Sequence, residues 1–181
     1  MIDITLLHPI IVHFTIALFS VAVVLDILAY FTKKESFHTA AWINLIVAGS
    51  AAIFTVISGL LAEANVPHND AAHEIMETHE TLGFFVLGAI LILLTWRIFL
   101  KGRFPAKGAL WYVAIGVTGL VLMFTGAYYG GEMVYVHGVA VKAVPISHDE
   151  AGHHHSSEAE SPSGVKKSGT HVHKDSSVHE H

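Results

Sequence analysis

The sequence predicts an all-α membrane protein, a four-helix bundle, and three observations lead to this expectation. Of the 181 residues, 52% are hydrophobic and only 14% are charged, as in small proteins that cross a membrane several times. Four apolar segments are each long enough to span a bilayer, at about 9–31, 39–61, 82–100 and 109–129. From about residue 147 the sequence is polar. We therefore expect a transmembrane domain over 1–141 and a flexible tail over 142–181.

The distribution of basic residues predicts the orientation. Lys33 and Lys34 lie between the first two segments, and Lys101, Arg103 and Lys107 lie between the last two, whereas 62–80 carries no Lys or Arg. By the positive-inside rule, both termini and 62–80 face away from the cytoplasm. We expect a bacterial inner membrane protein, in contact with lipids, whose two termini are periplasmic.

Composition narrows the chemistry. A formal net charge of −5 gives no reason to expect a nucleic-acid partner. The chain has no cysteine, which excludes disulfides, thiolate metal sites and covalent c-type haem attachment. Fifteen histidines are therefore the main candidate ligands for a transition metal.

The first segment carries a histidine inside its apolar run. Pro9 can start the helix, and His13 follows four residues later with Ala17 one further turn on. An imidazole at that depth loses its water and needs a partner, which makes it a functional candidate. The alternative is a hydrogen bond to a neighbouring helix.

The helical period separates two histidines before the third segment. Asn69 or Asp70 can cap a helix that continues into the membrane. His79 shares a face with apolar residues and with Gly83, so we expect it to point into the bundle. His73 shares a face with acidic residues and should point to water or to a rim.

One helical face of the fourth segment carries small residues and methionine, continues beyond the segment and ends in a histidine: Gly116, Gly119, Met123, Gly126, Gly130, Met133, His137. Gly116, Gly119 and Gly126 indicate close helix packing. The second segment offers no ligand. Asp26 and Arg97 lie at similar depth and predict a structural ion pair.

Small residues lie beside several candidate ligands. Ala17 follows His13 by four residues, Gly83 follows His79 by four, and Gly130 precedes His137 on its stripe. A flat macrocycle needs such a gap beside its axial ligand, so the pattern favours haem over a compact ion.

The tail from about residue 147 is polar and holds eight histidines, including His153 to His155. It lacks the apolar residues needed for a core of its own. Its histidines and acids favour weak divalent metal binding, and a solvated linker is the alternative.

Three motifs resemble a bacterial membrane-protein family catalogued as domain of unknown function 2231: Leu7-His8-Pro9-Ile10-Ile11-Val12-His13-Phe14-Thr15-Ile16-Ala17-Leu18, His79-Glu80-Thr81-Leu82-Gly83, and Gly130-Gly131-Glu132-Met133-Val134-Tyr135-Val136-His137-Gly138. Thr15 stands where the family usually has proline. The resemblance implies a four-helix module in a redox setting, similar to b-type membrane cytochromes with two haems.

The leading hypothesis is a b-type cytochrome with one haem, or two, near the periplasmic face. His13 and His79 are the expected axial pair, with iron as the metal. His137, together with His8 or His73, would supply a second pair or a propionate contact, and Met133 is a weaker candidate ligand. Two axial histidines favour an electron-transfer subunit over a stand-alone enzyme.

The expected partners are a quinol, a periplasmic c-type cytochrome, or a larger respiratory or photosynthetic complex. Two other hypotheses stay open. The first is a membrane protein that handles Zn, Ni or Cu through its tail. The second is a structural subunit whose histidines only form hydrogen bonds.

Overall fold

The computed structural model describes residues 7–66 and 69–141, and this part of the chain forms four helices. They are α1 (Leu7–Thr32), α2 (Glu35–Glu63), α3 (Asp70–Phe99) and α4 (Ala109–Tyr135). Each is long and apolar enough to cross a membrane. The predicted all-α membrane bundle is confirmed, whereas the predicted tail lies outside the described residues.

Local chemistry sets where the helices begin and end. The side chain of Asn69 accepts a hydrogen bond of 2.9 Å from the backbone N–H of Ala72 and so caps α3, as predicted. Lys33 has a φ of 56°, and its left-handed backbone ends α1 and turns the chain into α2 within two residues. Gly108, with a φ of 82°, is the left-handed N-cap residue at which α4 begins.

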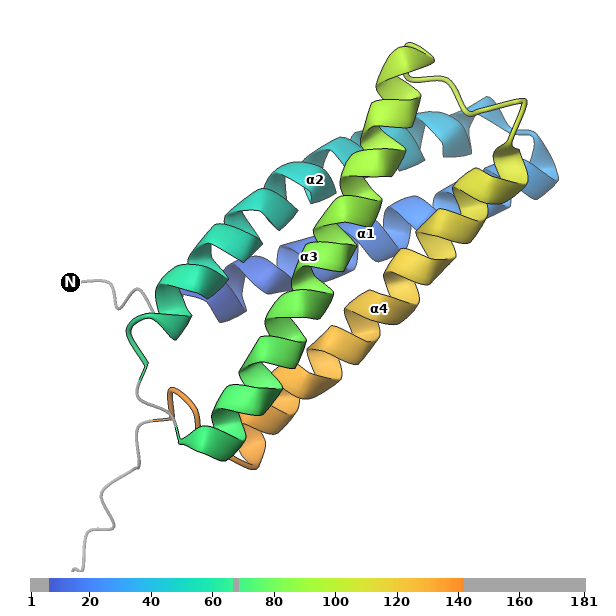
Figure 1. Cartoon of the computed structure of the whole chain (residues 1–181). Helices are drawn as coiled ribbons and strands as arrows, with labels where there is room; N and C mark the ends of the chain where they lie inside the picture. Colours follow the sequence, from blue (N-terminus) through green and yellow to red (C-terminus); the bar gives the residue numbers. More distant parts are fainter. Residues whose placement is uncertain (1–6, 67–68, 142–181) are drawn as a thin grey trace, which may run out of the picture. The chain divides into compact units, whose positions relative to one another are not determined.

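The helices form two hairpins, α1–α2 and α3–α4, whose turns lie at the same end of the bundle (Figure 1). We call this the arginine end, because it contains Arg97. The opposite end contains His8 and His79, and we call it the histidine end. His8 and Asp26 are 18 residues apart on α1, and His79 and Arg97 are 18 residues apart on α3. Each separation corresponds to about 27 Å at 1.5 Å per residue. That length is close to the hydrocarbon thickness of a bilayer.

The two hairpins bury equivalent positions that lie 71 residues apart. In α1 these are Thr15, Phe19, Ala22 and Asp26, and in α3 they are Val86, Ile90, Leu93 and Arg97. In α2 they are Ala41, Leu45, Ala48 and Ala52, and in α4 they are Tyr112, Gly116, Gly119 and Met123. Equivalent faces of the two hairpins therefore form the core, as in an internal parallel repeat.

Glycine allows α4 to approach its neighbours closely. A Cβ on Gly119 would lie 3.0 Å from Phe19 Cζ, and one on Gly116 would lie 3.3 Å from Val23 Cγ2. The predicted packing role of these two glycines is confirmed.

Candidate functional site

His8, in the first turn of α1, is held against α2 by its Nδ1 atom. Nδ1 lies 3.0 Å from the carbonyl oxygen of Thr55 and 3.3 Å from Ser58 Oγ. A carbonyl oxygen only accepts hydrogen bonds, so Nδ1 carries the proton and donates it. In the neutral ring Nε2 is then the unprotonated nitrogen.

Gly59 makes this contact possible. It lies one turn after Thr55, and a Cβ at this position would stand 3.1 Å from His8 Cε1. The missing side chain lets the imidazole reach the α2 backbone.

His79 repeats the arrangement in the second hairpin. Its Nδ1 donates to the carbonyl oxygen of Gly126 at 2.8 Å, across the same 47-residue separation as the bond from His8 to Thr55. A Cβ on Gly130 would stand 3.2 Å from His79 Cε1. Gly130 is thus the counterpart of Gly59, 71 positions later.

The two imidazoles, one from each hairpin, lie side by side. Their ring centres are 6.1 Å apart, and the ring planes are nearly perpendicular, at 85°. Within residues 7–66 and 69–141, the Nε2 atoms of His8 and His79 have no hydrogen-bond partner. The histidine end therefore presents two neighbouring nitrogen lone pairs.

Open space lies at Gly83 on α3. A Cβ on Gly83, one turn after His79, would meet no atom within 4 Å, although the residue is partly buried.

The structure places the other candidate ligands elsewhere. His13 is exposed, and its Nδ1 donates to the carbonyl of Pro9 in its own helix. Ala17 is exposed as well. The ring that the structure brings to His79 is thus that of His8, whereas the sequence suggested His13.

His73 and His79 diverge as the helical period predicted. His73 is exposed and pairs with Glu77, Nε2 to Oε1 3.4 Å, whereas His79 is half-buried. That prediction is confirmed. Met133 is half-buried in the last turn of α4, and His137 is half-buried in the turn that follows.

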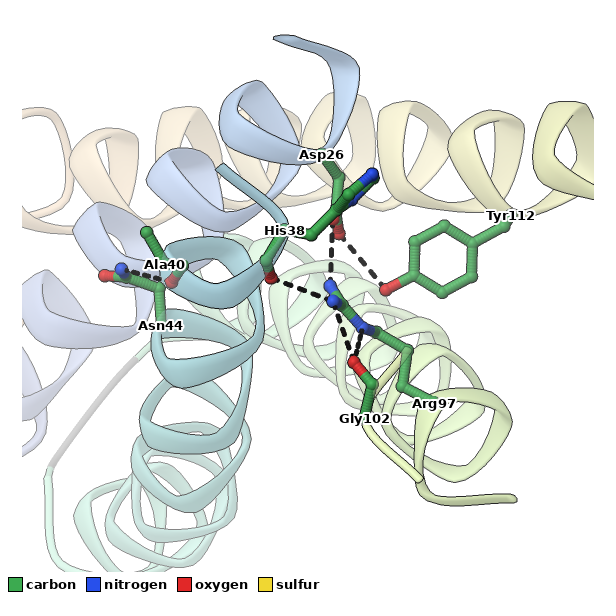
Figure 2. A network of polar contacts seen from close by, with 7 residues as sticks. All are labelled: Asp26, His38, Ala40, Asn44, Arg97, Gly102 and Tyr112. Atoms are coloured by element: carbon green, nitrogen blue, oxygen red, sulfur yellow. Dashed lines mark hydrogen bonds and ion pairs between the residues drawn. The ribbon is translucent and has the colours of Figure 1, made fainter. Parts of the chain in front are cut away.

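The arginine end holds a closed polar network (Figure 2). Arg97, which is fully buried, donates to Asp26 Oδ1 at 2.8 Å and to the carbonyls of His38 and Gly102. Tyr112 donates to Asp26 Oδ2 at 3.2 Å. The predicted ion pair between Asp26 and Arg97 is confirmed. The network as a whole joins α1, α2, α3 and α4.

Thr55, Ser58 and Gly59 were not among the predicted site residues, because the second segment contains no ligating side chain. Their contribution is a backbone carbonyl, a hydroxyl and an absent side chain. The signal in the sequence is the equal His-to-Gly spacing in the two hairpins, His8 to Gly59 and His79 to Gly130.

The fold and the site define a multi-pass membrane protein built from two similar helical hairpins with a paired-histidine site between them. The chain belongs to the family described as predicted membrane protein (DUF2231), whose model matches residues 5–143. No curated protein and no solved structure matches the chain significantly.

Proposed function

We propose that this protein is a b-type membrane cytochrome in which His8 and His79 are the two axial ligands of one haem. Two Nε2 atoms carry the proposal: they have no hydrogen-bond partner among the described residues, and they belong to rings whose centres lie 6.1 Å apart. In metal sites, a ligating imidazole usually donates its second N–H to a carbonyl or a carboxylate, which orients the ring and raises its basicity. Thr55 and Gly126 supply such carbonyls.

The number of ligands favours haem over a compact ion. In the described part of the chain, no group of three or more His, Cys, Asp or Glu residues could hold a metal. Structural zinc sites use four protein ligands, whereas a haem iron held by two histidines needs only two from the protein.

The open space at Gly83 also fits a flat macrocycle, because a larger side chain there would occupy the volume beside His79. His8 takes the place of His13 in the predicted axial pair. One haem is proposed, because His73 is exposed and paired with Glu77.

When bound, the haem iron would supply one-electron oxidation and reduction. With both axial positions filled by histidine, the group suits electron transfer rather than oxygen binding. The chain would bind and orient it at the histidine end, which the positive-inside rule places on the periplasmic side. A periplasmic c-type cytochrome or a larger respiratory complex is the proposed partner.

The test is an absorption spectrum of the full-length protein, purified from haem-replete cells, before and after dithionite. We expect a Soret band that shifts on reduction in the wild type, and its loss in His8→Ala and in His79→Ala. His73→Ala is the matched control on α3 and should keep the spectrum. Added imidazole should restore the band in the two alanine variants, because it can occupy the vacated position.

Two outcomes would contradict the proposal. One is a wild type without a Soret band. The other is a spectrum that survives His8→Ala and His79→Ala together. Removal of residues 147–181 separates the metal-handling hypothesis, since a cytochrome keeps its spectrum without the tail.

A further inference from the structure

His13 remains unused by the paired-histidine site, and its environment is unusual for an imidazole. It is exposed on α1 between Ile10 and Phe14, which are 58% and 61% exposed. It lies five residues deeper than His8, or about 7.5 Å further toward the membrane centre. With α1 spanning a membrane, an imidazole exposed at that depth would face hydrocarbon and would need a hydrogen-bond partner.

The internal repeat provides a comparison for this position. The counterpart of His13, 71 residues later, is Phe84, which is 47% exposed on α3. Phenylalanine is an ordinary side chain for contact with lipid. Only the first hairpin therefore carries a polar group at this position. The role of His13 thus differs from that of the paired-histidine site, to which both hairpins contribute.

The protonation of His13 defines what can bind. Its Nδ1 donates to the carbonyl of Pro9, so Nε2 of the neutral ring is a hydrogen-bond acceptor. In the described part of the chain, Nε2 has no partner. Acyl chains carry no donor, and phosphodiester groups only accept hydrogen bonds. An occupant that satisfies Nε2 has to bring a hydrogen-bond donor to this depth, and a hydroxyl on an apolar body that enters the bilayer does so.

We propose that His13 binds a membrane-soluble hydroquinone, with Nε2 accepting a hydrogen bond from one of its hydroxyl groups. The exposed ring of Phe14 offers an aromatic surface, and exposed Ala17, one turn deeper, leaves room for the ligand. The choice of a hydroquinone over another lipophilic alcohol rests on the proposed function, because such a molecule could serve as the redox partner of a haem on the same helix.

The probe is radiolabelled decylubiquinol, and the measurement is equilibrium binding to the full-length protein in phosphatidylcholine nanodiscs. We expect saturable binding that weakens at least ten-fold in His13→Phe, which recreates the residue of the second hairpin. His73→Phe is the matched control and should bind as the wild type does. Phe84→His should add a second binding site.

Ligand variants on the wild-type protein keep the test independent of protein folding. The dimethyl ether of decylubiquinol lacks both donors and should not compete. A diacylglycerol carries a lipid hydroxyl and should compete at least ten-fold more weakly than decylubiquinol. Equal competition by the ether would overturn the hydrogen bond, and equal competition by diacylglycerol would overturn the hydroquinone.

Unchanged decylubiquinol binding in His13→Phe would also overturn the inference. So would a wild type that does not bind decylubiquinol, together with a His13→Phe variant that loses self-association or a co-purifying subunit. The two proposals fail separately. A normal haem spectrum without decylubiquinol binding rejects only the His13 site, and binding by a protein without a Soret band rejects only the cytochrome.

Discussion

The two ends of the bundle differ in how the equivalent residues of α1 and α3 interact. At each end, one residue of α1 meets its counterpart on α3, 71 positions later. At the arginine end the two are Asp26 and Arg97, whose opposite charges satisfy each other within the protein. At the histidine end they are His8 and His79, two like groups that each offer a nitrogen lone pair. A complementary pair is complete by itself, whereas a like pair favours a third component between its members.

The arginine end should therefore govern stability, and Arg97→Leu is the sharpest way to break it. The variant leaves Asp26 as an uncompensated buried charge, which typically costs about 3–5 kcal/mol in the free energy of unfolding. Thermal denaturation in detergent measures the loss. The double variant Asp26→Leu with Arg97→Leu should recover most of it, and a double variant as unstable as the single one would contradict this account.

Overpacking behind the imidazoles should have the next largest effect, and a similar one in both hairpins. Gly59→Ala and Gly130→Ala each place a Cβ 3.1–3.2 Å from a histidine Cε1, and we expect each to destabilise by about 1–3 kcal/mol. Differential scanning calorimetry of the purified variants provides the comparison. Gly131→Ala is the control, because a Cβ there meets nothing within 4 Å. Unequal losses at Gly59 and Gly130 would weaken the equivalence of the hairpins.

Tyr112→Phe should cost less, about 1.5 kcal/mol, because it removes one hydrogen bond to the Asp26 carboxylate and leaves the ion pair with Arg97 in place. Chemical denaturation in detergent, followed by circular dichroism, measures this difference. Tyr128→Phe, at an exposed position, should have no effect. Equal losses from the two tyrosines would argue against the network as the stabilising element.

Gly83→Leu should be the least destabilising of these variants, because its Cβ meets nothing within 4 Å and leucine has the higher helix propensity. The same variant should block haem incorporation, because leucine fills the space beside His79. The Soret absorbance per protein reports this, with Gly88→Leu as the control at a second open position on α3. Full haem loading of Gly83→Leu would remove the space argument from the proposal.

Much of this architecture followed from the sequence. Apolar length predicted the four spans, matched depth predicted the pair of Asp26 and Arg97, and the helical period distinguished His79 from His73. Each of these depends on one helix at a time, or on depth along helices that share one direction. The equivalence of the two hairpins was not predicted, because few of the paired positions carry the same residue. It lies in which positions are buried.

The sequence by itself determined the class of protein, the depth of each polar group and the absence of thiolate chemistry. Only the tertiary structure decided which histidine meets His79. His8 and His13 are five residues apart on α1, about 140° around the helix at 100° per residue. The rotation of α1 about its own axis therefore turns His8 toward His79 and His13 outward. That rotation is set by Phe19, Ala22 and Asp26 packing in the core and by Gly59 admitting His8, contacts between helices that no single segment encodes.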